Sequence, residues 1–141
     1  MNVEECFQKK LLKKIAPDHL KAKNSLEIAE HKIARAQELF SEDFFAEAFV
    51  TAYTSMFHAA RSLLYLDGVQ EKGYYVVYVY LSEKYSQKIS RSLLEAFYVY
   101  QTERHKLLYG FDDESSKEKT QSILEDAEDF LLEVRKIHER I

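Results

Sequence analysis

Apolar residues recur at intervals of three and four positions along most of the chain, the spacing that places them on one face of an α-helix. Asp18 stands before one such repeat as a helix cap, and the repeat predicts a first helix over residues 18–40. The longest apolar stripe lies in residues 43–67 and ends at Gly68, in the place where a glycine commonly terminates a helix. We expect this second helix to be the central one.

Residues 74–81, with the sequence YYVVYVYL, are the one stretch whose local propensity favours a β-strand. Aromatic and β-branched side chains suit a pleated surface better than a helix. No other segment of the chain offers a partner strand, and a lone strand would leave its backbone donors and acceptors unsatisfied. We therefore predict a buried helix over residues 74–86.

Two further helices follow, and each opens with a Ser-x-x-Glu capping signature. The first begins at Ser92 and ends at Gly110. The second begins at Ser115 and keeps its apolar spacing as far as Ile141. Short connections between long helices favour antiparallel neighbours. The predicted fold class is all-α, an up-and-down antiparallel bundle of four main helices plus the shorter aromatic one.

The length of 141 residues is that of one ordinary domain, and no repeat or linker divides the chain. We expect a single helical domain over residues 1–141, with residues 1–17 as an N-terminal extension. The lone Cys6 can form no internal disulfide and no Cys/His spacing suggests zinc, so we expect a cytoplasmic protein with neither metal nor cofactor. The N-terminus is acidic where a signal peptide would be basic, and no apolar run suits a membrane span.

Charge is nearly balanced, with 20 Lys and Arg against 24 Asp and Glu, but it is unevenly distributed. Residues 111–141 hold five basic and ten acidic side chains, a net charge of −5. No broad basic face of the kind that binds nucleic acid is visible. The exception is KKLLKK at residues 9–14. There we favour a short solvated helical turn, with Leu11, Leu12 and Ile15 packed down, over a nucleic-acid or membrane arm.

A charged side chain lies in phase with the apolar stripe of the helix that ends at Gly110. At about 100° per residue, Arg104 falls within about 20° of Leu93 and Phe111 around that helix. A charge in an apolar seam must be paired, hydrogen-bonded or open to a wet cleft. Two interpretations stay open: an arginine that pairs with an acidic neighbour at the edge of the seam, or one that contacts an anion or phosphate in a groove.

A second face of the same helix carries His105, about 100° further round than Arg104. On the central helix, a minor polar stripe consists of Thr54, His58, Arg61 and Tyr65. If the two stripes meet, His58 and Arg61 join Arg104 and His105 in a cleft suited to a phosphate-bearing ligand. Two solvated faces predict the same residues. No glycine-rich phosphate loop, metal-binding His/Glu spacing or serine nucleophile elbow competes with this site.

Three segments together carry a family resemblance: KAKNSLEIAEHKIARAQELF in the first helix, AYTSMFHAARSLLYLDG in the central helix, and ERHKLLYG later in the chain. In this order they resemble the HEPN domains of prokaryotes, over roughly residues 20–135. Many HEPN proteins resemble metal-independent ribonucleases. Their motif is an arginine, a polar residue, and a histidine four to six intervening residues after the arginine. Two such motifs face each other across a dimer, so the resemblance implies a homodimer.

Mapped onto this sequence, the arginine of the motif falls on Arg104 and its polar residue on His105, but the histidine is missing. The three positions allowed for it hold Tyr109, Gly110 and Phe111. A phenol loses its proton only near pH ~10, so it is a poor general base at neutral pH, whereas an imidazole titrates near pH ~6.5. The resemblance thus implies a degenerate site of Arg104, His105 and Tyr109.

HEPN proteins also resemble partners of small nucleotidyltransferases, encoded beside them in toxin–antitoxin-like pairs. In one branch a later tyrosine receives a nucleotide; Phe111 holds that position here, which leaves Tyr109 as the candidate acceptor. Three functions stay open. The first is a dimeric binding module that partners a nucleotidyltransferase and binds a nucleotide or RNA. The second is a metal-independent ribonuclease toxin with residual activity, and the third is a helical scaffold without a ligand.

Overall fold

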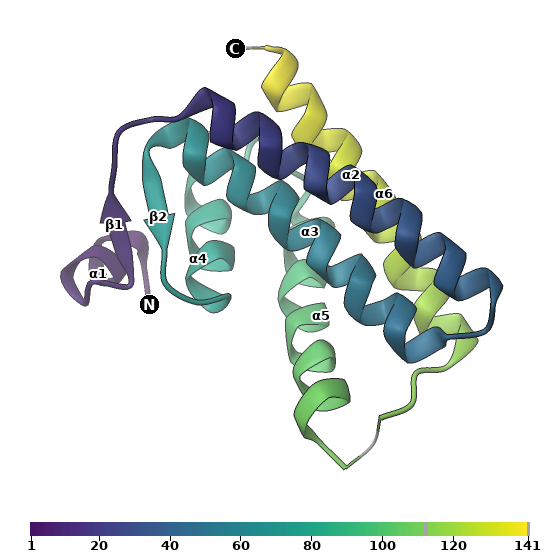
Figure 1. Ribbon diagram of the computed structural model, residues 1–141. Coiled ribbons are helices and arrows are strands. Elements are labelled where there is room, and N and C mark those ends of the chain that lie inside the picture. The colour runs from purple at the N-terminus through teal and green to yellow at the C-terminus, as the bar shows by residue number, and fades with distance from the viewer. Residues whose placement is uncertain (112, 141) are drawn as a thin grey trace.

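The computed structural model describes residues 1–111 and 113–140, and within them it has six α-helices and two short β-strands (Figure 1). The elements in chain order are α1 (Val3–Gln8), β1 (Leu12–Lys14), α2 (His19–Ser41), α3 (Phe45–Asp67), β2 (Val69–Glu71), α4 (Tyr75–Lys84), α5 (Arg91–Tyr109) and α6 (Lys117–Glu139). The all-α fold class predicted from the sequence is confirmed. Ile141, the last residue of the predicted apolar stripe, lies outside the described residues.

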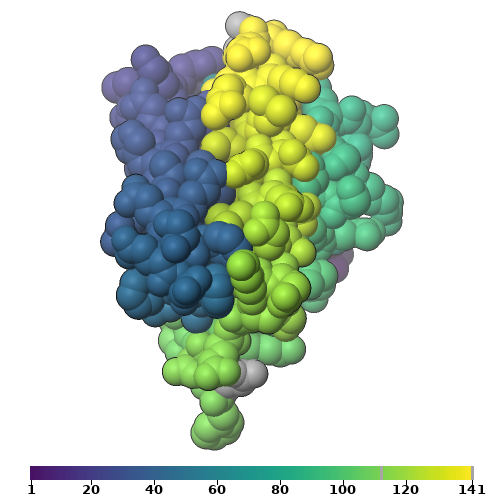
Figure 2. All heavy atoms as spheres, turned by 90° about the vertical axis from the view of Figure 1, so that its right-hand side faces the viewer, coloured from purple at the N-terminus to yellow at the C-terminus, as the bar shows by residue number. Residues whose placement is uncertain are grey.

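Three long helices form the body of the fold. The central helix α3 packs along α2 and against α6, and α2 also contacts α6. Figure 2 shows α6, in yellow, beside α2, in blue. The core between the helices is rich in aromatic rings, and Phe97 of α5 stacks on both Tyr53 and Phe130 with ring centroids 5.5 Å apart in each pair. These stacked rings anchor the first half of α5 to α3 and α6.

The aromatic segment 74–86 is helical, as predicted, and α4 spans Tyr75–Lys84. Its hydroxyl groups attach it to the end of α3. The Asp67 carboxylate accepts hydrogen bonds from the Tyr80 and Tyr85 hydroxyls, at 2.9 and 2.8 Å. In Figure 1, α4 and α5 run at an angle to the three long helices, and the C-terminal half of α5 extends below the body of the fold.

Residues 9–14 do not form the solvated helical turn that we expected from KKLLKK. Leu12–Lys14 form β1, which pairs antiparallel with β2 (Val69–Glu71), and Leu12 lies opposite Glu71. Leu12 is buried, as expected, whereas Lys13 and Lys14 are exposed. The helical-turn prediction is wrong because a partner strand does exist, and the two strands satisfy each other's backbone groups.

Gly68 makes this strand pairing possible. It ends α3 in the left-handed conformation, with φ of 72°, and its carbonyl accepts a hydrogen bond from the Ile15 amide at 2.9 Å. A Cβ at this position would lie 2.6 Å from the Ile15 carbonyl oxygen, so a larger residue would collide with backbone. The chain therefore turns from α3 directly into β2 and leads into the loop of residues 72–74.

Two of the predicted helix caps are shifted along the chain. The N-cap of α5 is Ser90 rather than Ser92, and that of α6 is Ser116 rather than Ser115. Asp18 caps α2 as predicted. The shifts leave the helical faces unchanged. Among the helices of residues 1–111 and 113–140, none combines the length and the apolar composition that crossing a membrane requires.

Candidate functional site

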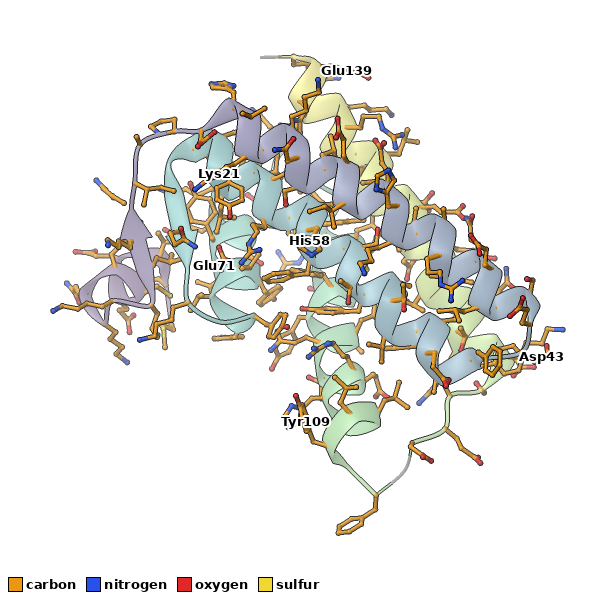
Figure 3. All side chains as sticks on the ribbon, in the orientation of Figure 1. Lys21, Asp43, His58, Glu71, Tyr109 and Glu139 are labelled. Carbon is orange, nitrogen blue, oxygen red and sulfur yellow. The ribbon has the colours of Figure 1, made fainter. Side chains whose placement is uncertain are left out.

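Arg104, His105 and Tyr109 line one surface pocket of about 310 Å³. On α5, His105 and Tyr109 lie about 100° and about 140° round the helix from Arg104, and the pocket extends across this arc. In the described part of the chain, the lining consists of Tyr74, Gln101, Thr102, Arg104, His105 and Tyr109. Tyr74 comes from the loop between β2 and α4, and Figure 3 shows Tyr109 near the C-terminal end of α5. The structure thus brings the three residues of the degenerate motif together.

The Arg104 guanidinium rests on two tyrosine rings. Its central carbon lies 4.7 Å from the Tyr74 ring centroid and 5.8 Å from that of Tyr53, within the range of cation–π attraction. One terminal nitrogen, Nη2, donates a hydrogen bond to the Tyr74 hydroxyl at 3.3 Å, while the buried Nε has no hydrogen-bond partner among the described residues. The arginine is therefore held in place but retains an unused donor.

No carboxylate among the described residues forms an ion pair with Arg104. The neighbouring Glu103 is engaged elsewhere: its carboxylate oxygens lie 3.3 Å from the Lys119 Nζ and 3.8 Å from the Lys106 Nζ. Of the two interpretations that the sequence left open, the acid-paired arginine is not what the structure shows. The guanidinium charge is available to an anion that enters the pocket.

His105 and Tyr109 form the outer wall of this pocket. Their rings lie 4.9 Å apart, as expected for neighbours one helical turn apart, and both side chains are exposed. The pocket therefore combines an inner guanidinium with two accessible rings, an imidazole and a phenol. Such a set can bind an anion, stack on a planar group and exchange protons with a ligand.

His58 and Arg61 do not line the pocket of Arg104 and His105. The Arg61 Nε and Nη2 lie 2.7 and 2.6 Å from one oxygen of Glu71, a buried carboxylate on β2. The buried Nδ1 of His58 has no hydrogen-bond partner within residues 1–111 and 113–140, and burial, followed by the charge of Arg61, lowers the pKa of the imidazole. Figure 3 shows His58 and Glu71 well separated from Tyr109.

A row of two rings between two cations nevertheless connects Arg61 with the pocket. The Arg61 guanidinium carbon lies 5.3 Å from the Phe57 ring centroid, and the centroids of the Phe57 and Tyr74 rings are 4.7 Å apart. The Tyr74 ring in turn contacts the Arg104 guanidinium. The sequence analysis did not identify Tyr53 or Tyr74 as site residues. Each belongs to an apolar or aromatic run, and periodicity cannot show which ring in such a run meets a cation.

Within residues 1–111 and 113–140, no group of three or more His, Cys, Asp or Glu side chains is arranged to hold a metal ion. Arg104 supplies a fixed positive charge, and His105 supplies the only imidazole on the lining of this pocket.

The structure is thus that of a helical domain in which an arginine rests on tyrosine rings at a surface pocket. A family model of the HEPN domain matches residues 22–137, and the chain belongs to this family. HEPN domains act as ribonucleases or bind nucleotides or RNA, and they commonly dimerise. Among curated proteins, none matches the chain. The matched range includes the whole pocket but neither α1 nor β1.

Proposed function

We propose that this protein is a dimeric HEPN-type binding module whose Arg104 pocket holds a phosphate group of a nucleotide or RNA. The state of the Arg104 guanidinium carries the proposal: it is fixed on two rings and lacks a carboxylate partner among the described residues. A guanidinium offers parallel donors that match two oxygens of a phosphate. Preorganisation of the side chain lowers the entropic cost of binding.

Arg61 and His58 receive a supporting role in this proposal. Arg61 links Glu71 to Phe57, and Phe57 packs against Tyr74, so these residues hold the ring on which Arg104 rests. His58 flanks this row, with its ring 6.0 Å from that of Phe57. Neither side chain needs to touch the ligand to affect its binding.

Isothermal titration with ATP and with a short 5′-phosphorylated oligoribonucleotide tests the proposal. A charge-assisted hydrogen bond contributes about 1.5–3 kcal/mol, so Arg104→Ala is expected to weaken binding by about 10- to 150-fold. Arg91→Ala is the matched control, because Arg91 lies on the same helix and pairs only with Glu95 at the surface. Absence of binding by the unmodified protein at millimolar ligand would instead support a helical scaffold.

The second candidate function is a residual metal-independent ribonuclease. Its support is that His105 lines the same pocket as Arg104, so an imidazole is present although it stands in a different place from the histidine of the motif. Cleavage of RNA in the presence of a chelator, abolished by His105→Ala and by Arg104→Ala, would establish it. Cleavage that survives both substitutions would point to a contaminant.

The dimer in this proposal pairs α5 of one chain with α5 of its partner. Besides Tyr109, the outer side of α5 leaves three large apolar or aromatic side chains at least 43% exposed: Tyr98, Val99 and Leu108. A two-fold contact along α5 would cover them and place two Arg104 pockets in one shared groove. Light scattering coupled to size exclusion is expected to give about twice the chain mass of 16.6 kDa at micromolar concentration. A monomer under these conditions would remove the shared groove.

The partner that we propose is a small nucleotidyltransferase in a toxin–antitoxin-like pair. The exposed Tyr109 hydroxyl is the candidate acceptor: its oxygen would attack the α-phosphorus of a nucleoside triphosphate, release pyrophosphate and lose its proton to solvent. Intact-mass measurement after incubation with such an enzyme and ATP is expected to show one added nucleotidyl group. Tyr109→Phe should abolish the addition, and modification that persists in this variant would exclude the assignment.

A further inference from the structure

A second surface of the protein concentrates positive charge over β1. A hollow of about 460 Å³ is lined by Phe7, Lys10, Leu12, Lys13 and Lys14, with no acidic residue in its lining. Lys9 follows α1 at the start of the same segment, and all four lysines are exposed. None of the four forms an ion pair with a residue in the described parts of the chain. We call this surface the lysine hollow.

The loop that follows β2 links the lysine hollow to the Arg104 pocket. The Lys72 amide donates a hydrogen bond to the Leu11 carbonyl at 2.8 Å, so the loop is attached to the lysine-bearing segment. Two residues later, Tyr74 forms a wall of the Arg104 pocket. Consecutive Cα atoms are about 3.8 Å apart, so the Cα atoms of Lys72 and Tyr74 are at most about 7.6 Å apart. Figure 1 shows β1, β2 and the start of α4 side by side.

We propose that the lysine hollow is a second contact for the backbone of a single-stranded RNA whose phosphate occupies the Arg104 pocket. The proposal rests on the proposed function, because the pocket has to hold a phosphate of the same strand. Lysine ammonium groups are flexible point charges that suit sequence-independent contacts to phosphates. The ring of Phe7 adds an apolar surface on which a base can stack. The ligand class is then an oligonucleotide rather than a mononucleotide.

An anionic membrane surface is the other partner that clustered lysines can attract, and the packing of α1 argues against it. A helix that lies on a bilayer inserts an apolar face. Two of the three apolar side chains of α1, Val3 and Cys6, are buried inside the protein, which leaves only the partly buried Phe7 for such a face. The lysine hollow also lies outside residues 22–137, the range that the family model matches. It is therefore a feature of the N-terminal segment of this chain.

Fluorescence anisotropy tests the proposal with 5′-phosphorylated oligouridylates of about four and about sixteen nucleotides, which bracket common single-strand site sizes. The test variant is Lys9→Gln/Lys13→Gln/Lys14→Gln. Lys10 is left unchanged because its φ of 60° would complicate a substitution. The matched control is Lys32→Gln/Lys117→Gln/Lys136→Gln, which removes the same charge from exposed positions on α2 and α6.

Each phosphate contact to single-stranded nucleic acid contributes about 0.7 to the slope of log affinity against log salt. Loss of three contacts is expected to flatten this slope by about 2 for the longer RNA. Raising the salt from about 50 to about 200 mM should therefore weaken RNA binding by the unmodified protein roughly 20-fold more than RNA binding by the test variant. The control variant should keep the original slope, and so should Lys9→Arg/Lys13→Arg/Lys14→Arg.

Equal slopes for the test and control variants would overturn the proposal. The proposal would also be overturned if the test variant lost as much affinity for the short RNA as for the long RNA. Lysine-dependent binding to phosphatidylserine vesicles without lysine-dependent RNA binding would overturn it in favour of a membrane surface. Failure of the proposed function has a different signature, because Arg104→Ala would then leave the affinity for the short RNA unchanged. Unchanged circular dichroism and melting temperature of each variant confirm that folding does not account for the result.

Discussion

Removing the Tyr74 ring should weaken the Arg104 pocket without removing its charge. In Tyr74→Ala, the guanidinium loses the nearer of its two rings, the one whose centroid lies at 4.7 Å, and it also loses its hydrogen-bond partner. Tyr74→Phe removes only the hydroxyl, which accepts a long hydrogen bond of 3.3 Å. The two variants therefore separate the contribution of the ring from that of the hydroxyl.

The expected magnitudes follow from these contacts. A partly exposed cation–π contact contributes about 0.5–1 kcal/mol, and a ring pair such as Tyr74 with Phe57 about 0.5–1.5 kcal/mol. Tyr74→Ala should therefore lower the free energy of unfolding by about 1–2.5 kcal/mol. A side chain that is no longer held in place costs about 0.5–1.5 kcal/mol on binding, which corresponds to roughly 2- to 12-fold weaker binding. Tyr74→Phe should stay within about 0.5 kcal/mol of the unmodified protein in both quantities.

Urea unfolding and titration with ATP measure the two effects in the same preparations. Arg104→Ala/Tyr74→Ala completes a double-mutant cycle, in which the effect of Tyr74 on ATP affinity should vanish once the arginine is gone. An undiminished effect of Tyr74 in the absence of Arg104 would refute the idea that the ring acts by holding the guanidinium. Equal losses in Tyr74→Phe and Tyr74→Ala would assign the effect to the hydroxyl instead.

Three further outcomes are expected. Tyr109→His places an imidazole at a position that the ribonuclease motif allows, so RNA cleavage should rise by about 10²- to 10⁴-fold over the unmodified protein. Equal cleavage rates of the two proteins in a gel assay would show that the pocket cannot use this imidazole. Gly68→Ala should lower the urea midpoint more than Gly73→Ala. A Cβ at position 68 would lie 2.6 Å from the Ile15 carbonyl oxygen, whereas a Cβ at position 73 would meet nothing within 4 Å. Burial lowers the pKa of His58 and His138 below the usual 6.5, so the unfolded state binds more protons just below that pH and stability falls as the pH drops through about 6.5. The melting temperature should decline in that window, and His58→Gln/His138→Gln should flatten the decline.

The long helices could be predicted from sequence because their apolar spacing reports directly which face is buried. The helix at YYVVYVYL was predicted against its local propensity by asking where its backbone hydrogen bonds would go, and α4 confirms that argument. For KKLLKK, by contrast, the sequence did not reveal the strand that pairs with it. A three-residue strand is too short to show a period of two, and its partner becomes visible only once Gly68 has turned the chain back toward Ile15.

The candidate site was only half visible in the sequence. Helical phase placed Arg104 on the apolar stripe of its helix and His105 on a second face, whereas the structure brings both side chains, together with Tyr109, to one pocket. The rings that hold Arg104 come from α3 and from the loop before α4, and only tertiary packing decides which aromatic residues meet a cation. Likewise, the buried Glu71 that neutralises Arg61 lies on a strand that was not predicted.

The pairing of β1 with β2 is expected to open and close independently of the helical body of the fold. Two strands of three residues hold few hydrogen bonds, and 54 residues of chain separate Lys14 from its partner Val69. Such a ladder can open at a small fraction of the free energy of global unfolding, so its amides should exchange with deuterated solvent long before those of α3. Because Lys13 and Lys14 stand on this ladder, each opening event would also disperse the positive charge that they concentrate. In the proposed RNA complex, opening of the ladder would therefore weaken the contacts that the lysines make with the strand.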